Sequence, residues 1–148
     1  MAIAFTTVSN SIAALSVSGL VIKDIDEVPG AVDPRQPTMM PLPDFMTGFE
    51  VIRDSYGAGV AKMTATYQLN YRLCYAPIGD GRTVTQEQQS GLVAMVGLVL
   101  DAILAISTFT GGVDIVPLAV VNMGIVADPS DRSYWGCDFA FMVTEFVN

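Results

Sequence analysis

The stretch from Val60 to Tyr75 constrains the fold more than any other part of the sequence. Every second residue in it is apolar or aromatic, and the residues between are mostly polar or basic. The apolar set is Ala61, Met63, Ala65, Tyr67, Leu69, Tyr71, Leu73 and Tyr75. Alternation with a period of two predicts a β-strand that has one face on a core and the other in water.

This predicted strand is long enough to suggest a role outside the core. At roughly 3.3 Å per residue it would span about 50 Å, whereas a typical strand holds about five or six residues. The preceding segment, Phe45–Tyr56, alternates loosely, and Gly57-Ala58-Gly59 is typical of a tight turn. We therefore predict an extended hairpin whose outer part projects beyond the core and reaches a neighbouring subunit.

Two segments have the apolar spacing of helices. The first carries Phe5, Val8, Ile12 and Leu15 on one face, and we expect it to end at Gly19. The second begins with a capping-box pattern, Thr85 followed by Gln88, and is expected to run to about Thr108 before Gly111-Gly112. Its apolar residues cover more than half of its circumference, which suits a helix packed across a sheet.

Further short segments are predicted strands. They are Leu20–Ile22, Thr38–Leu42 (limited to an edge or a bulge by Pro41), Val113–Ile125 and Tyr134–Val147. The expected fold is a single α+β domain over residues 1–148, with a mixed, mostly antiparallel sheet, a long β-hairpin and two α-helices packed on one face.

Asp128 and Asp131 would form the turn before the last strand through Asx hydrogen bonds.

The segment Asp24–Pro37 interrupts this pattern with three prolines, one glycine and four acids. No regular element is expected in it, so we predict an exposed loop or arm with a functional role or disorder. Asp24, Asp26 and Glu27 could hold calcium, but the glycine-punctuated ligand spacing of an EF-hand is missing. We expect no metal or other cofactor.

Composition favours an assembly. Apolar residues make up 51% of the chain and charged residues 15%, against about 25% in typical soluble domains. Part of the surface is therefore expected to be covered by other subunits; the alternative is a monomer with a Thr, Ser and Gly surface. The net charge of −8 and the scattered bases argue against binding of nucleic-acid phosphates.

The cysteines and the apolar segments favour a protein made in a reducing cytoplasm. Cys74 and Cys137 have no CxxC partner, and a disulfide between them does not follow from spacing. Met1–Leu20 lacks the basic start of a signal peptide. Gly91–Ile106 is shorter than the roughly 20 residues of a membrane span, so we expect a buried helix there.

Catalytic chemistry is not indicated. The sequence has no histidine, no Gly-rich phosphate loop and no GxSxG or HExxH motif. Asp114 and Asp138 could face each other across strands, yet no pocket residue accompanies them. The tyrosines at 67, 71 and 75 could stack bases, but core or interface packing is the simpler interpretation. We therefore expect a protein that is not an enzyme.

The order of elements resembles the tail-terminator proteins of long-tailed bacteriophages. A helix precedes the short strand at Pro37-Thr38-Met39-Met40, the long hairpin follows, and a second helix leads to a closing strand. That last strand has the form Trp-x-x-Asp-Φ-x-Φ, where Φ is apolar, beginning at Trp135 and ending Thr144-Glu145-Phe146. The resemblance spans most of the chain, and the acidic loop is an elaboration of it.

The resemblance implies a virion structural protein of the tail or neck, assembled in the host cytoplasm. Such subunits form a ring, usually of six chains, that caps the tail tube protein and meets a head-completion or connector protein. DNA would pass through the lumen without specific binding, which acidic charge would favour. The alternatives are another head–tail connector or tail-tube-like subunit, or a small-ligand-binding or enzymatic α+β domain.

The candidate subunit or partner interface combines the acidic loop with the hairpin. Its residues are Asp24, Asp26, Glu27, Arg35, Tyr56, Gly57, Gly59, Lys62, Tyr67 and Tyr71. No membrane contact is expected.

Overall fold

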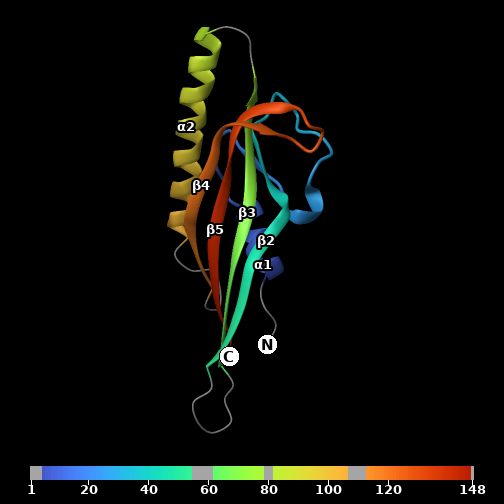
Figure 1. The fold of residues 1–148 in the computed structure, drawn as a ribbon. Coiled ribbons are helices and arrows are strands. Elements are labelled where there is room, and N and C mark those ends of the chain that lie inside the picture. The colour runs from blue at the N-terminus through green and yellow to red at the C-terminus, as the bar shows by residue number, and fades with distance from the viewer. Residues whose placement is uncertain (1–4, 55–61, 79–81, 107–112, 148) are drawn as a thin grey trace.

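The computed structural model describes residues 5–54, 62–78, 82–106 and 113–147. They form a curled, mostly antiparallel sheet of five strands with two α-helices, so the expected α+β class is confirmed (Figure 1). The elements are α1 (Phe5–Ala13), β1 (Val21–Ile22), the 3₁₀ turn η1 (Ile25–Glu27), β2 (Thr38–Asp54), β3 (Lys62–Pro77), α2 (Arg82–Ala105), β4 (Val113–Ala127) and β5 (Ser133–Val147).

The alternating segment forms the central strand of the sheet. The strand order is β1-β2-β3-β5-β4, and only the short β1–β2 pair is parallel. β5 pairs with β3 from Pro77, opposite Tyr134, down to Met63, opposite Val147. The described part of β3 is therefore flanked on both sides and does not stand clear of the sheet as a two-stranded arm. The predicted turn at 57–59 lies outside the described residues.

β2 is one strand where the sequence predicted two. Its register on β3 jumps between Pro41, opposite Tyr71, and Met46, opposite Leu69. The Nδ2 of Asn70 holds the bulged segment in place by donating to the carbonyl of Asp44 at 2.8 Å and to Oγ1 of Thr47 at 3.1 Å. A bulge accommodates prolines because it removes the need for paired N–H groups.

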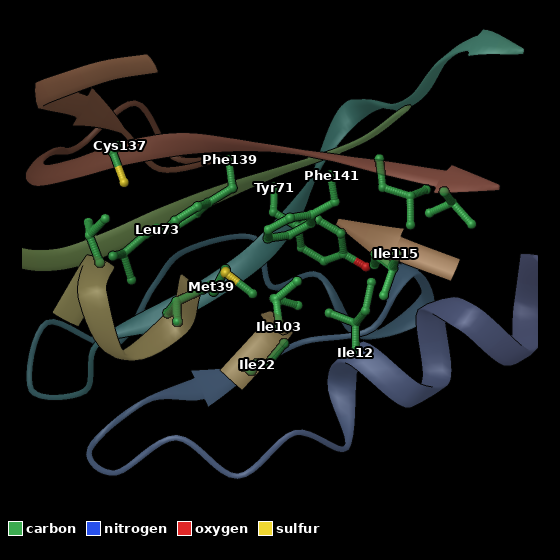
Figure 2. Packing of buried hydrophobic residues seen from close by; sticks show 14 of the residues in the cluster. Ile12, Ile22, Met39, Tyr71, Leu73, Ile103, Ile115, Cys137, Phe139 and Phe141 are labelled. Carbon is green, nitrogen blue, oxygen red and sulfur yellow. The ribbon is translucent and has the colours of Figure 1, made fainter. Parts of the chain in front are cut away.

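One face of the sheet carries the main core, as the alternation predicted. Ala65, Tyr67, Leu69, Tyr71 and Leu73 are all buried. The cluster also contains side chains of α1, α2, β1, β2, β4 and β5; Figure 2 shows its members meeting between the strands and the N-terminal segment. They include Val8, Ile12, Ile22, Met39, Leu92, Val99, Ile103, Ile115, Phe139 and Phe141.

The opposite face of the sheet also carries buried side chains and is not fully exposed to solvent. A second, smaller cluster forms there from Val32, Met40, Cys74, Val126 and Tyr134. Val32 belongs to the predicted exposed loop, yet its N–H donates to Oδ2 of Asp128 at 3.0 Å and its carbonyl accepts from the Tyr134 hydroxyl at 3.1 Å. The loop is thus tied to the sheet at this point.

The loop also contains a regular element, which corrects the prediction that it has none. The turn η1 begins after Asp24, whose Oδ1 accepts a hydrogen bond from the N–H of Ile25 at 2.7 Å. An aspartate is well suited to this position because its side chain satisfies a backbone donor that the turn leaves open.

Both helix boundaries differ from the predictions. α1 ends at Ala13, well before Gly19, and α2 begins at Arg82, before the predicted cap at Thr85. α2 also keeps only one side in the core, which corrects the expectation of a buried helix: Leu92, Val99 and Ile103 are buried, whereas Val93, Leu98 and Leu104 are exposed.

Candidate functional site

An ion pair lies in the middle of the sheet face opposite the main core. Arg72 of β3 and Asp138 of β5 are direct partners across the ladder. The Nε of Arg72 donates to Oδ1 of Asp138 at 2.6 Å, and its Nη2 donates to Oδ2 at 2.9 Å. Nη1 donates to the carbonyl of Ala127 at 3.1 Å. Paired donors of this kind fix both position and orientation of the guanidinium.

Asn122 completes this network from the neighbouring strand. It lies where the register of β4 on β5 shifts, with a φ of 54°, a left-handed conformation that asparagine tolerates better than most residues. Its Nδ2 donates to Oδ2 of Asp138 at 2.8 Å. The irregularity in β4 therefore directs an amide at the carboxylate, a common use of bulges.

The network sets the charge of both partners. Burial on its own raises the pKa of Asp138, but the hydrogen bonds from Arg72 and Asn122 outweigh it and lower that pKa. The hydrogen bond to Asp138 raises the pKa of Arg72. The pair is therefore ionised at neutral pH, and the two charges balance.

Asp128 organises the turn between β4 and β5 as the sequence predicted. Its Oδ1 accepts from the N–H groups of Ser130 and Arg132 and from the Ser130 hydroxyl, at 3.0, 2.9 and 2.6 Å. Burial raises the pKa of Asp128, but these bonds and the one from Val32 lower it overall. Asp128 is structural, because its oxygens are used by the turn and by the loop.

An open cavity, which we call the Arg72 hollow, lies between the acidic loop, the bulge of β2 and this turn. Its volume is about 440 Å³. It is lined by Ile25, Val28, Met40, Pro41, Leu42, Pro43, Phe45, Arg72, Ala127, Asp128 and Pro129. Most of these side chains are apolar, and Arg72 is the only cation among the lining residues described.

The two open edges of the sheet carry exposed apolar side chains. On β2, beyond its short pairing with β1, these are Phe49, Val51 and Ile52, each 44–54% exposed. On β4 they are Val116, Leu118, Val121, Met123 and Ile125, each 43–63% exposed. α2 adds Val93, Leu98 and Leu104. Exposed apolar side chains of this size are common at surfaces that contact other proteins.

The two described tyrosines of the predicted interface are buried. Tyr67 and Tyr71 are 0% and 1% exposed, so neither presents a side chain to a partner. Arg35 is exposed and forms an ion pair with Asp33 at 3.1 Å. Lys62 begins β3, opposite Asp54. Tyr56, Gly57 and Gly59 lie outside the described residues.

The acidic residues Asp24, Asp26 and Glu27 do lie together beside the Arg72 hollow, since Ile25 and Val28 of the same segment line it. Carboxylate oxygens of the three lie within 4.8 Å of one another. Exposed acids commonly lie this close without an ion, and Asp24 already caps η1. The cluster places negative charge beside the Arg72 hollow.

The structure also places two pairs that the sequence left open, Asp114 with Asp138 and Cys74 with Cys137. Asp114 lies opposite Thr144, and Asp138 lies opposite Val121, so the two aspartates do not face each other. Cys137 lies opposite Leu73, and Cys74 lies opposite Gly136. Adjacent positions on a strand point to opposite faces, and both cysteines are buried and free.

Glu145 is a buried acid in the core rather than part of a surface site. It is 2% exposed and neighbours Ala65 and Val113 across the ladders. Burial first, and then the charge of Glu145 and a hydrogen bond with it, raise the pKa of the Tyr67 hydroxyl. The tyrosine thus stays neutral and provides the carboxylate with a polar neighbour.

By length and composition, α2 could also cross a membrane between Thr85 and Ala105. Its buried residues Leu92, Val99 and Ile103 pack into the main core cluster. An exposed apolar side combined with a packed one is equally typical of a helix that meets another protein.

No family model matches the chain, and no curated protein matches it either.

The sequence analysis did not predict the network of Arg72, Asp138 and Asn122, although the sequence contains a signal for it. Arg72 is a cation inside the most apolar alternating strand of a chain that has few charges. A charge in a central strand requires a partner.

Proposed function

We propose that the chain is a virion structural protein, a tail terminator that forms a ring of about six copies, caps the tail tube and joins it to the head or neck. The observation that carries the proposal is the pair of apolar edges. Val51 and Ile52 are exposed on β2, and Leu118 and Val121 are exposed on β4. Among the described strands, nothing beyond β1 pairs with either outer edge.

The position of these two edges supports a ring. β2 and β4 lie on opposite sides of the central β3–β5 pair. The β2 edge of one copy can therefore meet the β4 edge of the next copy. A head-to-tail contact between two different surfaces generates a closed ring when the rotation closes. A two-fold dimer would instead need one surface that complements itself.

In this proposal, the outer edge of β2 forms one side of the interface and the outer edge of β4 forms the other, and the two helices cover one face of each subunit. The acidic charge of the chain, net −8, suits a lumen through which DNA slides without adhering. The tube protein and the connector protein would meet the two ends of the ring. The resemblance in element order supports this assignment over a catalytic one.

Native mass spectrometry of the purified protein tests the ring directly. We expect a closed oligomer of about six chains at micromolar concentration. A chain that stays monomeric at all accessible concentrations would contradict the proposal.

The edge variants Leu118→Lys on β4 and Ile52→Lys on β2 test the head-to-tail geometry. Each is expected to abolish the ring, because a lysine on either edge opposes burial against a neighbour. An equal mixture should give one-to-one heterodimers, since the intact β2 edge of one variant can still meet the intact β4 edge of the other. Gln89→Lys on the exposed side of α2 is the charge-matched control and should leave the ring intact. Homodimers of either single variant would exclude the head-to-tail arrangement.

A further inference from the structure

The Arg72 hollow has the size and lining of a binding site. Its volume of about 440 Å³ falls within the roughly 300–1,000 Å³ typical of ligand pockets. Met40, Leu42 and Phe45 line it from β2, and Ile25 and Val28 line it from the acidic loop. An apolar group is the natural occupant of such a lining.

Arg72 supplies the polar selectivity of the hollow. A guanidinium has five N–H donors, and three are used, by the two oxygens of Asp138 and by the carbonyl of Ala127. Two donors have no acceptor among the described residues. Asp138 already balances the positive charge, so a neutral carbonyl oxygen is a better acceptor here than a second carboxylate.

The rim favours a side chain inserted from outside over an added strand. Pro41 and Pro43 have no N–H to offer an incoming backbone, and proline at a sheet edge blocks strand addition. The hollow is also open, with Val28 40% exposed at its border. A free small ligand is normally enclosed by its pocket, whereas a partner chain covers the rim as it inserts an anchor residue.

The charge around the rim determines which residues should flank the anchor residue of the partner. Asp24, Asp26 and Glu27 surround Ile25 and precede Val28, while Asp44 stands between Pro43 and Phe45. Asp44 is exposed and close enough to act electrostatically on Arg72. An anchor flanked by lysine or arginine would therefore be attracted, and one flanked by acids would be repelled.

From these features we infer that the Arg72 hollow binds a partner protein by one aliphatic side chain flanked by basic residues, with a backbone carbonyl of that segment accepting from Arg72. The inference goes beyond the ring proposal and does not depend on it, because the hollow is built within a single chain. In this inference, the acids of the loop attract the basic residues that flank the anchor residue of the partner.

A peptide titration followed through methionine methyl groups tests the inference. The probe is acetyl-Lys-Lys-Leu-Lys-amide, added at up to millimolar concentration to protein labelled on the methionine methyl carbons. Met40 lines the hollow, whereas its neighbour Met39 is buried in the main core on the other face. We expect a saturable shift of the Met40 resonance, assigned with Met40→Leu, and little shift of Met39.

Matched probes and variants separate docking from nonspecific attraction. The peptide with serine in place of leucine, and the one with glutamates in place of lysines, should each bind at least tenfold more weakly. Val28→Asp should weaken binding of the leucine peptide at least tenfold, while Val93→Asp, at an exposed site on α2, should leave it unchanged. No Met40 shift, equal shifts of Met39 and Met40, or equal binding of the serine peptide would overturn the proposal, whatever the oligomeric state.

Discussion

Arg72 and Asp138 are direct partners across β3 and β5 and meet through two parallel hydrogen bonds of 2.6 and 2.9 Å. The side chain of Asp138 is 9% exposed and that of Arg72 is 26% exposed, so the pair is largely withdrawn from water. A cation in the central strand of an apolar sheet is tolerated only because this carboxylate lies opposite to it. The pair also positions the guanidinium at the wall of the Arg72 hollow.

Replacing Asp138 should therefore be costly. Asp138→Asn leaves a largely buried guanidinium without its counter-charge, and we expect the free energy of unfolding to fall by roughly 3 kcal/mol. Urea denaturation measures this change. The surface pair Arg35–Asp33 is the control: its side chains are 88% and 49% exposed, so Asp33→Asn should have no measurable effect. Equal effects of the two substitutions would show that Asp138 has no special structural role.

Stability should fall in acid because of Asp138 and Asp128. Both have pKa values below the unfolded value of about 3.9, so the unfolded chain binds more protons as the pH falls through this range. Their contribution is fully present above the unfolded pKa and is lost as the pH falls through the lower, folded pKa. Urea midpoints measured from pH 6 to pH 2.5 should drop below about pH 4. Asp138→Asn should show a shallower drop than the native chain.

The alternation between residues 61 and 75 was sufficient to predict the core face of β3. It could not predict what lies on the other face, because burial there depends on contacts that are distant in sequence. Cys74 is covered by Val32 and Tyr134, and Val32 comes from a segment whose prolines and acids indicated an exposed loop. Composition describes local preference, whereas this loop is held by hydrogen bonds to residues about 100 positions away.

The Arg72 hollow could not be predicted either, because it is also built from residues that are distant in sequence. Its lining comes from η1, the bulge of β2, β3 and the turn after β4. Pro41 predicted an edge or a bulge, but the sequence indicated two separate strands, Thr38–Leu42 and Phe45–Tyr56, rather than a continuous one. Asn70 joins the two halves, and no local pattern predicts that its amide reaches Asp44 and Thr47.

The two cysteines should be unreactive in the folded protein. Burial raises the pKa of both the Cys74 and the Cys137 thiol to about 12, and the thiolate is the reactive form. Alkylation at pH 8 should therefore be slow in buffer and fast for both thiols in urea, with mass spectrometry counting the adducts. The residues occupy opposite faces of the sheet, so mild oxidation of the folded chain should give no intramolecular disulfide. Formation of that disulfide would require a different register between β3 and β5.

Two glycines in regular elements should respond to alanine in opposite ways. A Cβ at Gly136 would overlap the carbonyl oxygen of Leu73, a backbone atom of the neighbouring strand that cannot move without breaking the ladder. Gly136→Ala should therefore destabilise the protein strongly, with a loss of about 3 kcal/mol or more, or prevent folding. Gly97 lies on the exposed side of α2, and a Cβ there meets no atom within 4 Å. Gly97→Ala should stabilise by roughly 0.5–1 kcal/mol, because alanine loses less backbone entropy in a helix. Thermal denaturation of both variants decides the matter: a tolerated alanine at 136 would mean that β3 and β5 do not pair at this register.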